Sequence, residues 1–420
     1  MADLFKIGLS GLRTTNQSLS VISHNIANVS TAGFKSGRAE FAALYTGGQP
    51  GGVEVAKVSQ NFDADGPVEY TGRSLDLAIS GQGFFVTNLN GQIAYTRAGT
   101  FSKDANNFIV GANGMRLQGY ATNAQGELLI GVVRDLQIST ASLPAKASTN
   151  VELVGNLKAD AAVITAPFDP ANASSYNYSQ SSKVYDSLGG EHVLTQFFIK
   201  TGANTWNVQY RMDGGSASVG AGTLTFDANG RLVGTPAGAN VVHNVAFTPT
   251  TGASAMAITV DLGTTVPASP PATPDEVAKF VSPISQFASD FGFTRNESDG
   301  YGAGELAGVR IDEEGSLFAV FTNGQDKLQG KVVLASFANP GGLRQGNDSS
   351  WYQSFASGQP VVGAPGGGTL GLLTAGAYEG SNVELTSELV NLMTAQRNYQ
   401  ANAKSISTAD KMTQVLFNSI

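Results

Sequence analysis

The sequence predicts a mainly β protein with an α-helix at each end, and three observations support this fold class. Apolar residues near both termini recur at alternating steps of three and four, which is the spacing of one helix face. Most of the residues between them alternate with the period of two that is typical of strands, and the 51 glycines of the chain mark many turns. We expect the terminal helices to pair in a coiled-coil-like bundle, followed outward by a β domain and an inserted outer β domain.

The first helix is expected to run from about Asp3, a plausible N-cap, to about Asn28. Gly8 and Gly11 lie inside it, and each costs about 1 kcal/mol relative to alanine. That cost is bearable if a neighbouring backbone comes close at these positions. Thr15 interrupts the apolar seam of this helix, which we assign to Leu12, Leu19, Ile22, Ile26 and Val29.

The last helix carries a longer but weaker seam, because Gln396, Asp410 and Thr413 dilute it. Such helices draw most of their stability from packing. The helical domain, residues 1–30 and 383–420, is therefore expected to be largely disordered in a lone subunit and to order on assembly. The seam positions of the last helix are Leu385, Leu389, Leu392, Tyr399, Ala403, Ile406, Phe417 and Ile420.

Two stretches with the strand-like period of two lie between the terminal helices and the middle of the chain. Asn90-Gly91 separates two alternating runs and is the strongest short hairpin signal in the chain, and Asn323-Gly324 repeats this pattern. These blocks predict a discontinuous β domain over residues 73–145 and 281–355. Residues 31–72 and 356–382 are then connecting segments between this domain and the helices.

An outer β domain is expected to be inserted at residues 146–280. Linker-like stretches border it at 139–145 and 267–274, and strand-like runs lie between them. The Gly-rich segments 47–52 and 363–368 either act as hinges or are ordinary surface loops, and the sequence favours neither alternative.

Composition excludes several function classes. The net charge of −8 argues against nucleic acid and anionic membranes as partners, and the absence of cysteine excludes disulfides and thiol chemistry. Neither a Sec signal peptide nor a membrane-spanning segment is expected.

No catalytic, cofactor or metal site is predicted. The only histidines, His24, His192 and His243, are scattered without metal or triad spacing. The carboxylates at 312–314 precede Gly315, as in a hairpin turn. A secreted β-rich enzyme is therefore only a remote alternative.

Three stretches of the sequence resemble the bacterial flagellar rod and hook protein family. Residues 23–35 are similar to its N-terminal signature, 71–85 to its core β motif, and 381–385 with 394–404 to its C-terminal signature. His24 stands where asparagine is more usual. The positions that match the motifs are Asn25, Asn28, Gly33, Phe34, Gly72, Leu75, Asp76, Gly83, Phe84, Gln396, Arg397, Tyr399 and Asn402.

This resemblance implies a structural protein without catalytic activity. The length and the single large insertion are typical of the hook members of the family, and a distal-rod or other axial protein is the alternative. The resemblance implies a helical homopolymer outside the cell, a curved tube that joins rod to filament as a universal joint. It also implies export through the flagellar type III apparatus. Its expected partners are further copies of itself, the distal rod, the hook cap, and the hook–filament junction and hook-length control proteins.

Overall fold

The computed structural model describes residues 2–46, 49–123, 126–233, 240–264 and 284–418. This part of the chain divides into two compact units. Unit 1 comprises Met1–Thr140, Ala307–Val320 and Asp326–Ile420, and unit 2 comprises Ala141–Leu306 and Phe321–Gln325. The second unit is thus an insertion into the first, as the sequence predicts.

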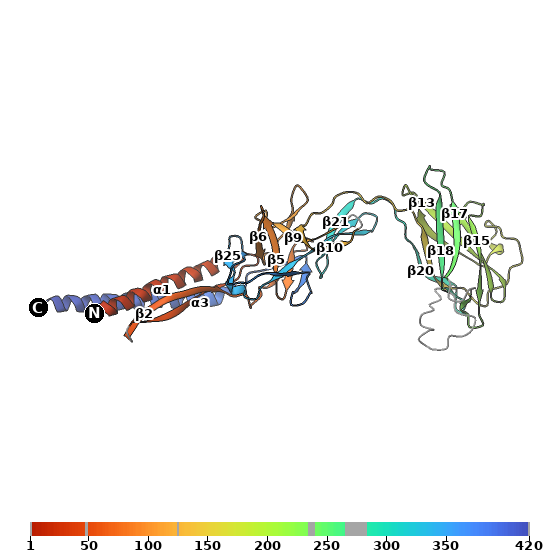
Figure 1. Ribbon diagram of the computed structural model, residues 1–420. Helices are drawn as coiled ribbons and strands as arrows, with labels where there is room; N and C mark the ends of the chain where they lie inside the picture. The colour runs from red at the N-terminus through yellow and green to blue at the C-terminus, as the bar shows by residue number, and fades with distance from the viewer. Residues whose placement is uncertain (1, 47–48, 124–125, 234–239, 265–283, 419–420) are drawn as a thin grey trace. The chain divides into compact units, whose positions relative to one another are not determined.

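Unit 1 contains the two terminal helices, α1 (Ala2–Ala27) and α3 (Leu385–Asn418). They pack side by side in antiparallel orientation, because Asn25 lies beside Glu388 whereas Gly11 lies beside Asn402 (Figure 1). Helix α1 begins at Ala2, so Asp3 lies in its first turn rather than at the predicted N-cap. It is followed by turns that reach Gly33, whose φ of +65° is the left-handed conformation expected there.

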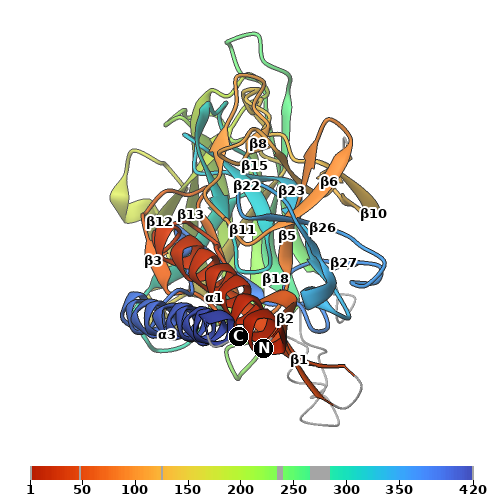
Figure 2. The same ribbon diagram turned by 90° about the vertical axis from the view of Figure 1, so that its left-hand side faces the viewer.

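A long β-hairpin occupies much of the segment that the sequence analysis assigned to a connection. Strands β1 (Gly37–Thr46) and β2 (Gln49–Gln60) pair antiparallel, from Gly37 opposite Gln60 to Thr46 opposite Gln49. The period of two that begins at Val53 was the signal for this hairpin. Both strands pack against α1 (Figure 2). The backbone N–H of Val53 donates to Ser10 Oγ at 3.2 Å. The connection is therefore an ordered layer beside the helices.

The β domain of unit 1 is built around the predicted hairpin β5–β6, whose turn residues Asn90 and Gly91 have φ of +52° and +89°. Its main sheet has the order β21-β22-β23-β9-β5-β6-β26-β25, with β7, β8, β10, β24 and β27 joined to it, while β4 pairs with β28 and β3 with β29. The strands are β3 (Val68–Tyr70), β4 (Leu77–Ser80), β5 (Phe84–Leu89), β6 (Gln92–Thr96), β7 (Ser102–Lys103), β8 (Ile109–Val110), β9 (Arg116–Thr122), β10 (Leu128–Asp135), β21 (Leu306–Ile311), β22 (Ser316–Phe321), β23 (Asp326–Val332), β24 (Leu334–Ser336), β25 (Arg344–Gln345), β26 (Ser350–Tyr352), β27 (Val361–Gly363), β28 (Leu372–Ala375) and β29 (Ala377–Glu379), with a 3₁₀ turn, η2, at Pro340–Gly342.

Unit 2 consists of two sheets. One has the order β12-β13-β14-β15-β16, and in the other β11 lies parallel to β18 and β19 and antiparallel to β20. The strands are β11 (Asn150–Asn156), β12 (Tyr178–Tyr185), β13 (Glu191–Gly202), β14 (Thr205–Met212), β15 (Gly220–Phe226), β16 (Leu232–Val233), β17 (Asn240–Phe247), β18 (Met256–Thr264), β19 (Ile284–Ser285) and β20 (Gly292–Ser298), with a 3₁₀ turn, η1, at Ala173–Ser175.

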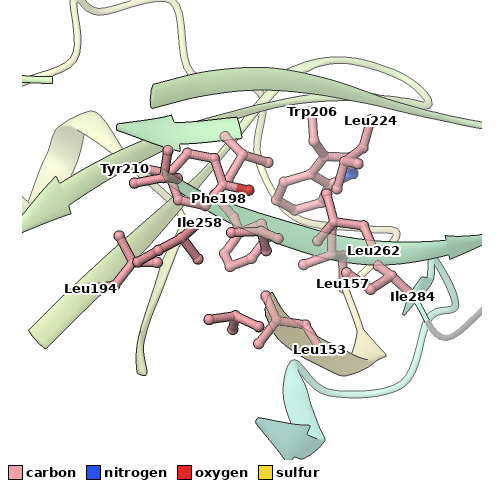
Figure 3. Packing of buried hydrophobic residues seen from close by; sticks show 14 of the residues in the cluster. Leu153, Leu157, Leu194, Phe198, Trp206, Tyr210, Leu224, Ile258, Leu262 and Ile284 are labelled. Atoms are coloured by element: carbon pink, nitrogen blue, oxygen red, sulfur yellow. The ribbon is translucent and has the colours of Figure 1, made fainter. Parts of the chain in front are cut away.

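The core of unit 2 is formed by side chains that point toward one another from both sheets, among them Phe198, Trp206, Ile258 and Leu262 (Figure 3). The predicted end of the insertion at residue 280 is wrong, because β19 and β20 pair with β11 and the unit extends to Leu306. The linker-like stretch 267–274 lies outside the described residues.

The two Gly-rich segments have ordinary folded contacts where they are described. Residues 47–48 lie outside the description, and Gln49 to Gly52 belong to β2. After β27, the N–H of Gly367 donates to the carbonyl of Ala364 at 3.1 Å, and Pro365 between them is buried. The second segment thus contains a closed turn.

Candidate assembly surface

The face of α3 that packs on α1 overlaps only in part with the seam that the sequence indicates, since Leu392 and Ile406 belong to both. The positions at which the two helices come closest identify the face of α3 that packs on α1. A Cβ added at Gly8 would lie 2.7 Å from Ile406 Cγ1, and one at Gly11 would lie 2.8 Å from Asn402 Nδ2. The two glycines therefore admit side chains of α3, where the sequence analysis expected a neighbouring backbone. The inward residues of α3 recur every three, four or seven positions, and they are Leu392, Ala395, Asn402, Ile406, Ala409 and Thr413.

Much of the predicted α3 seam is consequently left on the surface of the single chain. Leu385, Leu389 and Tyr399 are 43%, 45% and 42% exposed, and Ala403 is exposed beside them. At 100° per residue this stripe lies next to the α1-facing stripe, rotated around the helix by roughly a fifth of a turn. The side chain of Phe417 and the whole of Ile420 lie outside the described residues.

The predicted seam of α1 is better covered. Ile22 is buried, and Leu12, Leu19, Ile26 and Val29 are half-buried between α3, the hairpin and the turns after the helix. At the other end of α1, Phe5 and Leu9 are 48% and 38% exposed. The helix pair therefore presents apolar side chains to solvent on both of its members.

The N-terminal motif residues fix the end of α1 to its surroundings. The buried Asn25 side chain accepts from the Gly37 N–H and donates to the Gly37 carbonyl, both at 2.8 Å, and it donates to Glu388 Oε1 at 3.1 Å. Asn28 Nδ2 donates to the His24 carbonyl at 2.9 Å, and the His24 ring meets the buried Phe34 ring edge to face. These residues join helix, hairpin and α3.

A buried ion network follows directly, and the sequence analysis missed it. The Glu379 carboxylate, 2% exposed, accepts from Lys35 Nζ at 2.8 Å, from Arg97 Nη1 at 3.1 Å and from the Gly66 N–H at 3.0 Å. Asp65, half exposed, lies 3.5 Å from Lys35 and 3.3 Å from Arg97. The Gly33 N–H donates to the Glu379 carbonyl at 2.7 Å. Four segments that are far apart in the sequence meet at this carboxylate.

The core β motif supplies turns and one aromatic anchor. Gly72 and Gly83 have φ of +73° and +130°. The Asp76 carboxylate, itself buried, accepts from Thr71 Oγ1 at 2.6 Å, and the neighbouring Leu75 is half-buried. Phe84 packs with Tyr95, Phe337 and Trp351 in the core of the β domain.

The C-terminal motif has a divided role. Asn402 is half-buried against Gly11, whereas Gln396, Arg397 and Tyr399 are exposed. The packing of one subunit therefore leaves these three motif residues largely on the surface.

Unit 2 brings two histidines into polar contacts that the linear spacing did not reveal. His192 Nδ1 lies 2.7 Å from Asp213 and Nε2 lies 3.3 Å from Asp186. Burial disfavours the charged imidazole, but the two aspartates outweigh it and raise the pKa of His192. Burial lowers the pKa of His243 to about 4, and its Nδ1 lies 2.8 Å from the hydroxyl of Tyr210.

The described residues contain no group of three or more potential metal ligands. No helix in the described ranges is long and apolar enough to cross a membrane.

Comparison with known proteins decides the family. The matching family models are the flagella basal body rod protein over residues 5–35, the flagellar hook protein FlgE/F/G D1 domain over 78–158, the flagellar basal body protein FlaE D2 domain over 156–301 and the flagellar basal body rod FlgEFG protein C-terminal over 374–419. The flagellar hook protein FlgE of Escherichia coli K12 is 38% identical, with 99% of both chains covered.

The chain belongs to the flagellar hook protein family. The hook proteins of Salmonella typhimurium and Borreliella burgdorferi are 36% and 31% identical, with 99% and 97% of each chain covered. The chain is a structural subunit of the bacterial flagellar hook, as the three motifs predict. A crystal structure of the Helicobacter pylori hook protein FlgE2 is 14% identical and has a TM-score of 0.49 over 72% of this chain and 98% of that one.

Proposed function

We propose that copies of this chain assemble through their terminal helices into a curved helical tube that transmits torque from rod to filament as a universal joint. The apolar stripe that α3 leaves uncovered after it has packed on α1 is the observation that supports this. An exposed apolar helix face is stabilised when a second helix covers it. The subunit interface therefore includes Leu385, Leu389 and Tyr399.

The proposed tube lies outside the cell, and its subunits reach it through the flagellar type III export apparatus. Its contacts include the distal rod, the hook cap and the junction and length-control proteins. These statements rest on the family. The chain has a purely structural role in this proposal. Its terminal helices gain most of their order from neighbouring copies, because the surface buried between subunits offsets the conformational entropy that the helices lose when they order.

The test replaces the exposed stripe without touching the packing of α1 on α3. The triple variant Leu385→Ser, Leu389→Ser, Tyr399→Ser should fold with its thermal midpoint nearly unchanged, since all three side chains are exposed in one chain. In cells whose own hook gene is replaced by this variant, we expect no hooks by electron microscopy and no swimming. Leu188→Ser, at a position of unit 2 that is 68% exposed, is the matched control and should leave hooks intact. Normal hooks from the triple variant would refute the proposal.

A further inference from the structure

A groove of about 1140 Å³ opens in unit 1 between the hairpin β1–β2, helix α1 and the first half of α3. Arg38 and Glu40 of β1 line one side, and Glu388, Asn391 and Asn398 of α3 line the other. The hairpin and α3 each pack on α1, so α1 forms the floor between them. Such a space beside a helix pair can admit a further helix.

The groove is acidic and contains an acceptor without a partner. Its charged lining residues are three carboxylates, those of Glu40, Asp63 and Glu388, and one guanidinium, that of Arg38. Glu40 also lies 3.5 Å from Lys57. Glu388 Oε1 accepts from Asn25, whereas its Oε2 is buried and has no hydrogen-bond partner among the described residues. A buried acceptor left unpaired costs free energy, so an occupant that brings a cation is favoured.

Helix α3 carries a basic stripe on the side that faces away from α1. Arg397, Lys404 and Lys411 follow one another at steps of seven, which is nearly two turns, so they lie on one face. Each lies about half a turn around the helix from one of the α1-facing residues, the buried Ala395 and Ala409 and the half-buried Ile406. All three cations are exposed, and within the described residues none of them has an ion-pair partner.

One chain cannot bring this stripe into its own groove. The groove residues of α3 lie between Glu388 and Asn398. Lys404 and Lys411 lie beyond this range, and Arg397 lies within it but on a different face of the helix. Asn391 and Lys404, for example, are about 20 Å apart along the axis. The complementary charges therefore meet only between two copies. Because the two surfaces are different, the contact is head-to-tail, and a head-to-tail contact that does not close produces an open helical polymer.

We infer that the acidic groove of each subunit receives the basic face of α3 from a second copy, and that this contact sets the register between neighbours in the tube. The inference rests on the proposed function and specifies its interface. The apolar lining of the groove, Val21, Ile22, Ala39, Phe41 and Ala395, packs against the aliphatic stems of the incoming lysines.

Cysteine cross-linking tests this contact directly, because the chain has no cysteine of its own. We would combine Asn391→Cys in the groove with Gln400→Cys or Ser407→Cys, which interleave with the cations of the stripe and leave all three charges in place. Residues 391 and 400 are about 14 Å apart along one helix, too far for an intrachain disulfide. Hooks from cells that carry each double variant are oxidised and their proteins separated without reductant. We expect a ladder of trimers and larger species from at least one double variant.

Three comparisons decide the outcome. The single variants should give no ladder, and neither should Asn391→Cys with Ser405→Cys, an exposed position more than a third of a turn around the helix from both 400 and 407. Hooks that form normally but give no ladder with position 400 or 407 would overturn the inference while leaving the proposed function intact. A ladder from Asn391→Cys with Leu9→Cys instead would assign the groove to the basic face of α1, formed by Lys6 and Arg13, and would also overturn it. Failure of the unmodified chain to form hooks would contradict the proposed function itself.

Discussion

Replacement of Glu379 by glutamine should destabilise unit 1 strongly, although the change is isosteric. The side chain keeps its size, but Lys35 and Arg97, 1% and 5% exposed, lose the carboxylate that neutralises them. Removal of one partner from a buried ion pair costs about 3–5 kcal/mol, because the remaining charge stays desolvated. Asp65 lies within 3.5 Å of both cations and is half exposed, so it compensates in part. We therefore expect a loss near the lower limit, about 3 kcal/mol.

The assay uses the two tryptophans of the chain, one in each unit: Trp351 in unit 1 and Trp206 in unit 2. In a Trp206→Phe background, fluorescence follows unit 1 alone. For a unit of this size, a loss of 3 kcal/mol lowers the thermal midpoint by roughly 6–12 °C. Glu314→Gln, which breaks a pair in unit 1 between the 71% exposed Glu314 and Lys331, is the control and should change stability by less than about 1 kcal/mol. An unchanged midpoint of unit 1 in Glu379→Gln would refute the role of the network.

The remaining predictions concern unit 2, followed by Trp206 fluorescence in a Trp351→Phe background. The pKa of His192 is raised in the fold, so its stabilising contribution is complete below the unfolded value of about 6.5 and is lost as the pH rises through the folded pKa. Denaturant unfolding should show this loss above pH 6.5, and His192→Gln should abolish it. If the variant and the unmodified chain had the same pH profile, the ion pairs of His192 would have no stabilising role. His243 has the opposite effect on the pH dependence of stability, because its pKa is lowered in the fold to about 4. The free energy of unfolding of unit 2 should fall by about 3 kcal/mol as the pH falls from 6.5 to 4, and His243→Gln should flatten that part of the profile. Gly222→Ala should cost about 1–3 kcal/mol, since its Cβ would lie 2.1 Å from His243 Nε2, whereas Gly292→Ala meets nothing within 4 Å and should be nearly neutral.

Local signals in the sequence account for most of the fold of unit 1. Asn90-Gly91 and Gly33 adopt the conformations that their residue types favour, and the terminal stripes do form helices. The same kind of signal could have predicted the hairpin β1–β2, since apolar and polar residues alternate from Val53 within β2. The end of the insertion could not be predicted in this way, because β20 belongs to unit 2 only through its pairing with β11, a strand some 140 residues earlier.

The face that α3 turns toward α1 could not be predicted from its apolar spacing. Leu385, Leu389 and Tyr399 are more apolar than Asn402, and hydrophobicity alone places the seam on them. The close approach at Gly8 and Gly11 keeps Ile406 of the predicted seam but turns the contact toward Asn402, because only small positions on α1 let these two side chains come so near. In the proposed assembly, α3 uses one face for its own chain and an adjacent face for its neighbours, so no single face carries all of its apolar residues.

The buried network explains why the motif around Gly33 is needed in addition to the helix itself. Lys35, Arg97 and Glu379 come from distant segments with no common periodicity, so only the folded chain shows that they meet. A helix pair with exposed apolar faces packs weakly on its own, and torque would bend it at its base if only a flexible segment joined it to the β domain. Glu379 is bonded to segments that flank both helices, and Gly33 donates to its backbone, so the ends of α1 and α3 are held to the same β domain. In the proposed torque-transmitting tube, a load applied to the helices is thereby passed to a folded unit.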